Sequence, residues 1–113
     1  MNLRGVWAER QASHYLQSQG LELIARNYSC RLGEIDLVMA DHDTLVFVEV
    51  RQRNSARFGG AAASITLSKQ QKIQRAAEHF LMKHHHLSDM FCRFDVIAIQ
   101  GGSISWLRDA FEC

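Results

Sequence analysis

Proline is absent from this 113-residue sequence, cysteine is scarce, and no long hydrophobic run occurs. The three cysteines, Cys30, Cys92 and Cys113, are odd in number and show no C-x-x-C spacing, which argues against a disulfide framework or a structural zinc site. No apolar run approaches the roughly 20 residues that a membrane span needs. The N-terminal segment lacks the apolar region of a secretory signal. We therefore expect a cytoplasmic protein with reduced thiols and no membrane partner.

Internal repeats, low-complexity segments and linkers are also missing, so residues 1–113 are expected to form a single domain. The composition, with 47% hydrophobic and 22% charged residues, is ordinary for a globular protein.

The net charge of +1 hides an uneven distribution of charged residues along the chain. Residues 51–83 contain seven basic residues and one acidic residue, so the rest of the chain is net acidic. Such a basic segment favours a polyanionic partner, although a solvated helix face explains the charge equally well.

Periodicity and turn residues predict an α/β fold with the element order αβββαββ. Helices are expected at residues 3–19 and about 69–86, the second with a capping box of Ser68 and Gln71. A mobile loop containing Gly59 and Gly60 is expected at residues 53–65. The predicted strands are residues 21–29, 34–40, 44–52, 91–100 and 103–108. These elements suggest a small mixed β-sheet flanked by helices.

The segment TLVFVEVR, residues 44–51, places Glu49 in an otherwise apolar strand. An ionised carboxylate removed from water needs a cation or hydrogen-bond donors nearby. Pairing the strand with the preceding one in the register that aligns their apolar rows sets Met39 opposite Val46 and Leu37 opposite Val48. The same register sets Ile35 opposite Val50, Asp36 opposite Glu49 and Glu34 opposite Arg51.

Two carboxylates at such close range do not both stay ionised without a cation or a shared proton. Hard oxygen ligands with room for water suit Mg²⁺ or Mn²⁺, so Asp36 and Glu49 are candidate metal ligands. The alternative is a structural pair that shares a proton or forms salt bridges.

The motifs GEIDLVMA, LVFVEVRQR, FGGAAASIT and CRFDVIAI resemble those of the YraN family of predicted endonucleases. Asp36 followed by Glu49-Val50-Arg51 is also similar to the Asp…(Asp/Glu)-x-Lys core of the PD-(D/E)XK nuclease superfamily, and the family resembles archaeal Holliday-junction resolvases. The likeness implies a restriction-endonuclease-like core and metal-dependent hydrolysis of phosphodiester bonds, and it is compatible with a homodimer.

By this resemblance Asp36 and Glu49 bind Mg²⁺ or Mn²⁺, with Glu9 as a candidate third carboxylate and the carbonyl of Val50 as a further ligand. The superfamily lysine is replaced by Arg51, which stays protonated and is a poor proton acceptor. Lys69 continues the apolar stripe of the second helix and is the candidate for the role of the missing lysine.

The function expected from these residues is nucleic-acid binding, with DNA as the favoured polymer, and metal-dependent endonuclease activity. Asp36, Glu49, Arg51 and Lys69 are the candidate catalytic residues. The candidate nucleic-acid-binding residues are Arg53, Arg57, Lys72, Arg75 and Lys83. The alternatives are a non-catalytic nucleic-acid-binding module with a nuclease-like fold and a protein-interaction domain.

Overall fold

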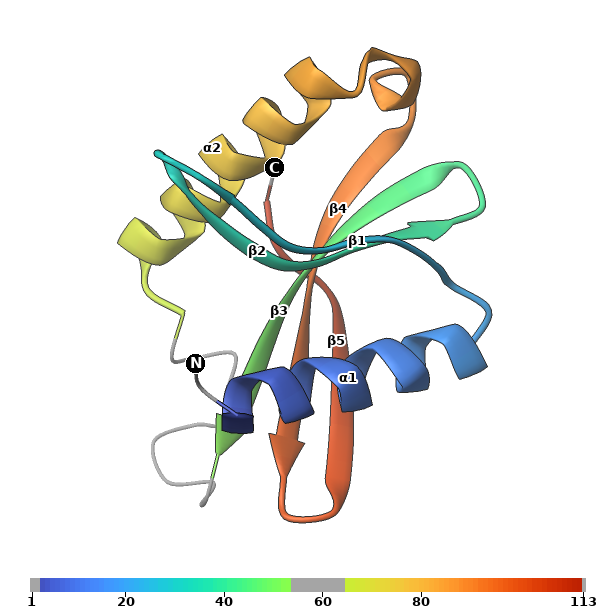
Figure 1. Cartoon of the computed structure of the whole chain (residues 1–113), viewed down its shortest axis with the longest axis vertical. Helices are drawn as coiled ribbons and strands as arrows, with labels where there is room; N and C mark the ends of the chain where they lie inside the picture. Colours follow the sequence, from blue (N-terminus) through green and yellow to red (C-terminus); the bar gives the residue numbers. More distant parts are fainter. Residues whose placement is uncertain (1–2, 54–64, 113) are drawn as a thin grey trace.

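The computed structural model of this protein contains a sheet of five strands flanked by two helices (Figure 1). The structure describes residues 3–53 and 65–112. The elements follow the order α1-β1-β2-β3-α2-β4-β5, with a short 3₁₀-helix η3 before β4, and this order confirms the predicted fold class. Their bounds are α1 Leu3–Ser18, β1 Glu22–Cys30, β2 Gly33–Asp41, β3 Thr44–Arg53, α2 Leu67–Lys83, η3 His85–Leu87, β4 Phe91–Gln100 and β5 Ser103–Phe111. Among these residues, no helix is long and apolar enough to cross a membrane.

The strands lie in the sheet in the same order as in the sequence, with β1 and β5 at the edges. All neighbouring strands are antiparallel except β3 and β4, which run parallel. A parallel pair needs a crossover connection, and α2 lies in that connection.

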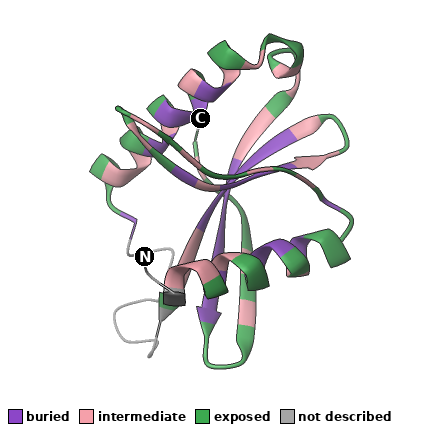
Figure 2. Ribbon diagram, in the orientation of Figure 1, coloured by how far each residue is buried: buried purple, intermediate pink, exposed green. Residues whose placement is uncertain are grey.

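The helices cover opposite faces of the sheet, and a separate hydrophobic core lies beneath each (Figure 2). Val46 and Val48 of β3 pack in the core under α1, whereas Leu45 and Phe47 pack in the core under α2. A central strand that is covered on both faces needs apolar side chains at successive positions. This explains why the segment around Glu49 is so uniformly apolar.

Two predicted boundaries of α2 are wrong. The helix begins at Leu67 with Thr66 as its N-cap, whose hydroxyl oxygen accepts a hydrogen bond from the Lys69 N–H at 3.1 Å. Thr66 therefore takes the capping position that was predicted for Ser68. The helix ends at Lys83, and the histidines that follow it enter η3.

The last strand is longer than its sequence pattern predicts, because β5 continues to Phe111. The ring of Phe111 stacks on Phe94 of β4 with 4.9 Å between ring centroids. This contact is non-local and leaves no periodic signal in the strand itself. Residues 54–64 of the predicted loop lie outside the described part of the chain.

The predicted register between β2 and β3 is confirmed only over the first part of the ladder. Met39 pairs with Val46 and Leu37 with Val48, and the ladder ends there. The predicted ladder pairs of Ile35 with Val50, Asp36 with Glu49 and Glu34 with Arg51 do not form.

At Asp36 the β1–β2 hairpin separates from β3. At the same point the regular alternation of β2 side chains between the two faces of the sheet is interrupted. Leu37 lies in the core under α1, whereas Ile35 lies in the core under α2. The predicted apolar row that joins Ile35 with Leu37 is therefore wrong. On β1, Asn27 lies between the residues paired with Ile35 and Leu37, and its φ of 52° interrupts the regular strand. This departure from β3 creates the candidate site.

Candidate active site

Asp36 stands where the ladder between β2 and β3 ends. The Val50 N–H donates a hydrogen bond to Asp36 Oδ2 at 2.8 Å, so a side-chain oxygen takes the place of a ladder carbonyl. The N–H and C=O groups of one strand residue point to the same side of the strand. The Val50 carbonyl is therefore directed toward the same gap as Asp36.

Glu49 projects from β3 into a site with two cations. Its side chain is only 7% exposed, and its Oε1 lies 3.3 Å from Arg51 Nη2 and 3.9 Å from Lys69 Nζ. Arg51 is two residues further along β3 and shares the face of Glu49, whereas Lys69 comes from the first turn of α2. Four of the predicted site residues are thus brought together: Asp36, Glu49, Arg51 and Lys69.

The cations do not fully compensate for the burial of these carboxylates. Burial raises the pKa of Glu49 to about 7, and the charge of Asp36 adds to this effect, while Lys69 and Arg51 oppose it. Burial also raises the pKa of Asp36, against the lowering effect of the Val50 N–H. Binding of a proton or a metal cation stabilises a site in which ionised carboxylates are unfavourable.

Glu9 brings a third carboxylate from α1. Ala8 and Ala12 anchor the helix in the core, and Glu9 is half-buried beside Asp36. Burial raises the pKa of Glu9 to about 7, and the charge of Asp36 contributes in the same direction. Glu9, the candidate third carboxylate, therefore lies next to Asp36.

Asn27 is a site residue that the sequence reasoning missed. With its amide nitrogen facing α1, it donates to Glu9 Oε1 at 2.7 Å and to Glu9 Oε2 at 3.0 Å. Its φ of 52° falls in the left-handed region that asparagine tolerates better than most residues. An asparagine in the middle of a predicted strand was the available signal.

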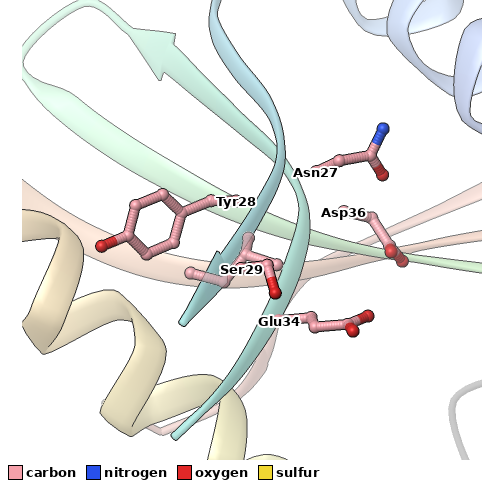
Figure 3. A pocket seen from close by; sticks show the side chains of 6 residues that line it. Asn27, Tyr28, Ser29, Glu34 and Asp36 are labelled. Carbon is pink, nitrogen blue, oxygen red and sulfur yellow. The ribbon is translucent and has the colours of Figure 1, made fainter. Parts of the chain in front are cut away.

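A hollow of about 140 Å³ opens beside Asp36 between β1 and β2. Figure 3 shows the side chains of Glu34 and Asp36 extending in the same direction, with Asn27 close to Asp36. Tyr28 extends the opposite way, toward α2, where its hydroxyl forms a hydrogen bond with His79 Nδ1 (Figure 3). The hollow is thus polar on the side of Asp36.

The residues present fit a divalent cation held by two carboxylates and one carbonyl. Asp36, Glu49 and the Val50 carbonyl supply hard oxygen atoms, the ligand type that Mg²⁺ and Mn²⁺ prefer. Within residues 3–53 and 65–112, no three His, Cys, Asp or Glu side chains are arranged to hold one ion together. Glu9, the candidate third carboxylate, accepts hydrogen bonds from Asn27 and interacts with Asp36.

The predicted nucleic-acid-binding residues of α2 lie at the surface. Lys72, Arg75 and Lys83 are exposed, away from the buried stripe of the helix. Arg53 ends β3, and its side chain lies outside the described part of the structure, as does all of Arg57.

Comparison with known proteins agrees with the motifs. The model of the uncharacterised protein family UPF0102 matches residues 8–99. A UPF0102 protein from Saccharophagus degradans is 57% identical over 110 residues, which cover 97% of this chain and 93% of the relative. Relatives from Psychromonas ingrahamii and Nitrosomonas europaea are 54% and 52% identical, over 98% and 96% of this chain and 91% and 93% of the relatives. The chain therefore belongs to the UPF0102 family, which is the YraN family that its motifs resemble.

Proposed function

We propose that this protein is a metal-dependent endonuclease that hydrolyses phosphodiester bonds in nucleic acid, with DNA as its substrate. The observation that carries the proposal is the convergence of Asp36 and Glu49 with Arg51 and Lys69 where β2 leaves β3. Acidic residues that hold a cation, next to basic residues that hold a phosphate, are the groups that phosphodiester hydrolysis requires.

In this proposal Asp36, Glu49 and the carbonyl of Val50 hold Mg²⁺ or Mn²⁺. When bound, such an ion acts as a Lewis acid on the phosphate and lowers the pKa of a bound water. The raised pKa of Glu49, about 7, supports a cation at this position because the site disfavours two uncompensated carboxylates.

The two basic side chains have different roles. Arg51 presents a planar guanidinium that stays protonated and suits binding of phosphate oxygens. Its side chain is 27% exposed beside Glu49, so part of the guanidinium group is accessible to an incoming phosphate. Lys69 carries a mobile ammonium that orients the attacking water and stabilises the negative charge that develops on the phosphate.

The exposed basic residues of α2 position the polymer. Lys72 and Arg75 lie on the same helix as Lys69, about one turn and about two turns further along it. Contacts from such side chains to phosphate oxygens give affinity that does not depend on base sequence. Arg53, Arg57 and Lys83 are the remaining proposed contacts.

The second candidate function is a nucleic-acid-binding module without catalysis. Arginine at position 51, where the superfamily has lysine, is the observation that favours it. The position of Lys69 favours the enzyme instead. Its Nζ lies 3.9 Å from Glu49 Oε1, so a lysine from α2 stands beside the carboxylate in place of a lysine on β3.

Calorimetric titration with Mn²⁺ tests the metal site. Asp36→Asn should weaken binding at least tenfold, because it removes the charge of one proposed ligand. The matched control is Asp89→Asn, which changes an exposed aspartate in the turn before β4 and should bind Mn²⁺ like the wild type. Equal binding by Asp36→Asn and the wild type would refute the site.

Labelled duplex, single-stranded and branched DNA, incubated with Mg²⁺ or Mn²⁺, tests the reaction. Cleavage that depends on the metal and is abolished by Asp36→Asn supports the enzyme, and Arg51→Lys should retain activity. Binding of DNA without cleavage under every metal condition supports the non-catalytic module.

A further inference from the structure

The tip of the β1–β2 hairpin carries an arginine that no site described above includes. Cys30 pairs with Gly33, so the turn between them consists of Arg31 and Leu32. Both residues are exposed, and Leu32 is 45% exposed although it is apolar. The turn therefore presents its side chains to solvent at the end of a hairpin that leads to Asp36.

This tip is packed against α2. A β-carbon on Gly33 would lie only 2.5 Å from the carbonyl oxygen of Lys72, so the hairpin and the helix backbone are in close contact. Further along the hairpin, the Tyr28 hydroxyl forms a hydrogen bond with His79. These two contacts align the hairpin with the helix, and Figure 1 shows β1 and β2 reaching α2.

The helix presents two further cations beside this contact. Lys72 and Arg75 are exposed and lie three residues apart, a spacing that places them on neighbouring positions of one helix surface. His79, which bonds Tyr28, lies four residues beyond Arg75. The surface of α2 that carries Lys72 and Arg75 thus borders the hairpin.

The distance from the tip to the acidic site matches a short stretch of polymer. Gly33 and Asp36 are three residues apart on β2, which corresponds to about 10 Å at 3.3 Å per residue. A nucleic-acid strand covers about 3.4 Å of duplex axis per nucleotide, so roughly three nucleotides span this distance. Glu34 lies between the two ends and disfavours a phosphate directly beside it.

We propose that Arg31, Lys72 and Arg75 form one phosphate-binding ridge, built from the hairpin tip and α2, which holds the nucleic-acid backbone about three nucleotides from the bond at Asp36. This inference rests on the proposed function and adds Arg31 to the residues that bind substrate. The packing of Gly33 on α2 holds the backbone of the hairpin tip next to the helix turn that carries Lys72. The ridge contacts phosphates and reads no base.

Fluorescence anisotropy with a labelled DNA duplex in metal-free buffer tests the ridge without cleavage. One phosphate contact with a salt slope of about 0.9 contributes about eightfold to affinity at 0.1 M salt. Arg31→Gln should therefore bind about eightfold more weakly at 0.1 M salt, with a salt slope shallower by about 0.9. Arg31→Lys should restore most of the affinity, because the contact depends on charge.

Arg108→Gln is the matched control, since Arg108 is an exposed arginine on β5, the opposite edge of the sheet from β1. It should bind like the wild type. If the wild type binds duplex while Arg31→Gln keeps both its affinity and its salt slope, the ridge is refuted and the proposed nucleic-acid binding stands. If the wild type binds no duplex, single-stranded or branched DNA, the proposed function is refuted, and the ridge with it.

Discussion

Replacing Glu49 by glutamine should change how the stability of the metal-free protein depends on pH. The side chain is 7% exposed, and burial raises its pKa from 4.5 to about 7. Between these values the unfolded chain ionises first, so the free energy of unfolding falls as the pH rises. Glu49→Gln has no proton to lose at this position and should lack the part of the fall that Glu49 contributes, whereas Glu9 and Asp36, whose pKa values are also raised, keep theirs.

The expected magnitude follows from the pKa difference. Each unit is worth 1.36 kcal/mol, so a rise from 4.5 to about 7 corresponds to about 3 kcal/mol between pH 4 and pH 8. Little of this is lost to solvent screening, because the carboxylate is buried. In urea, with a slope of about 2 kcal/mol per M, the midpoint of the wild type should fall by about 1.5 M relative to Glu49→Gln.

Urea unfolding at several pH values in the presence of a chelator measures this difference. Glu22→Gln, which changes an exposed glutamate on β1, should follow the wild-type curve. Adding Mn²⁺ at pH 8 should restabilise the wild type by about 2.7 kcal/mol at a hundredfold excess over the dissociation constant. Parallel pH profiles for the wild type and Glu49→Gln would refute the account of Glu49 as a carboxylate destabilised by burial.

Three further substitutions test other parts of the structure. Lys69→Ala should slow cleavage about a hundred- to a thousandfold and leave Mn²⁺ binding intact, and wild-type rates would contradict its role beside the carboxylates. Gly33→Ala should lower the free energy of unfolding by about 1–3 kcal/mol, because the added methyl group would meet the backbone of α2. Gly102→Ala, with open space around it, should not lower it, and equal stability of the two variants would contradict the close approach of Gly33 to α2. Asn27→Gly keeps the positive φ but removes two donors, so the pKa of Glu9, followed by carboxyl-carbon NMR, should rise above about 7, and an unchanged value would exclude this hydrogen bond.

Local patterns in the sequence were sufficient for the element order and for much of the site. The alternation in β3 depends only on neighbouring residues, which is why Glu49 and Arg51 were expected on one face. Turn length set the register near the β2–β3 turn, so the pair of Met39 with Val46 was predicted correctly. The stripe of α2 placed Lys69 toward the core for the same local reason.

The tertiary structure alone decided where the ladder ends and what replaces it. The departure of the hairpin at Asp36, the positive φ of Asn27 and the hydrogen bond from Val50 all depend on contacts between segments distant in the sequence. A constant register therefore mispredicted the partner of Arg51, which is Glu49 on its own strand and not Glu34 across the ladder. Periodicity predicts which face a side chain occupies, but the packing of α1 and α2 on the sheet decides which faces meet, because that packing is set by the whole core.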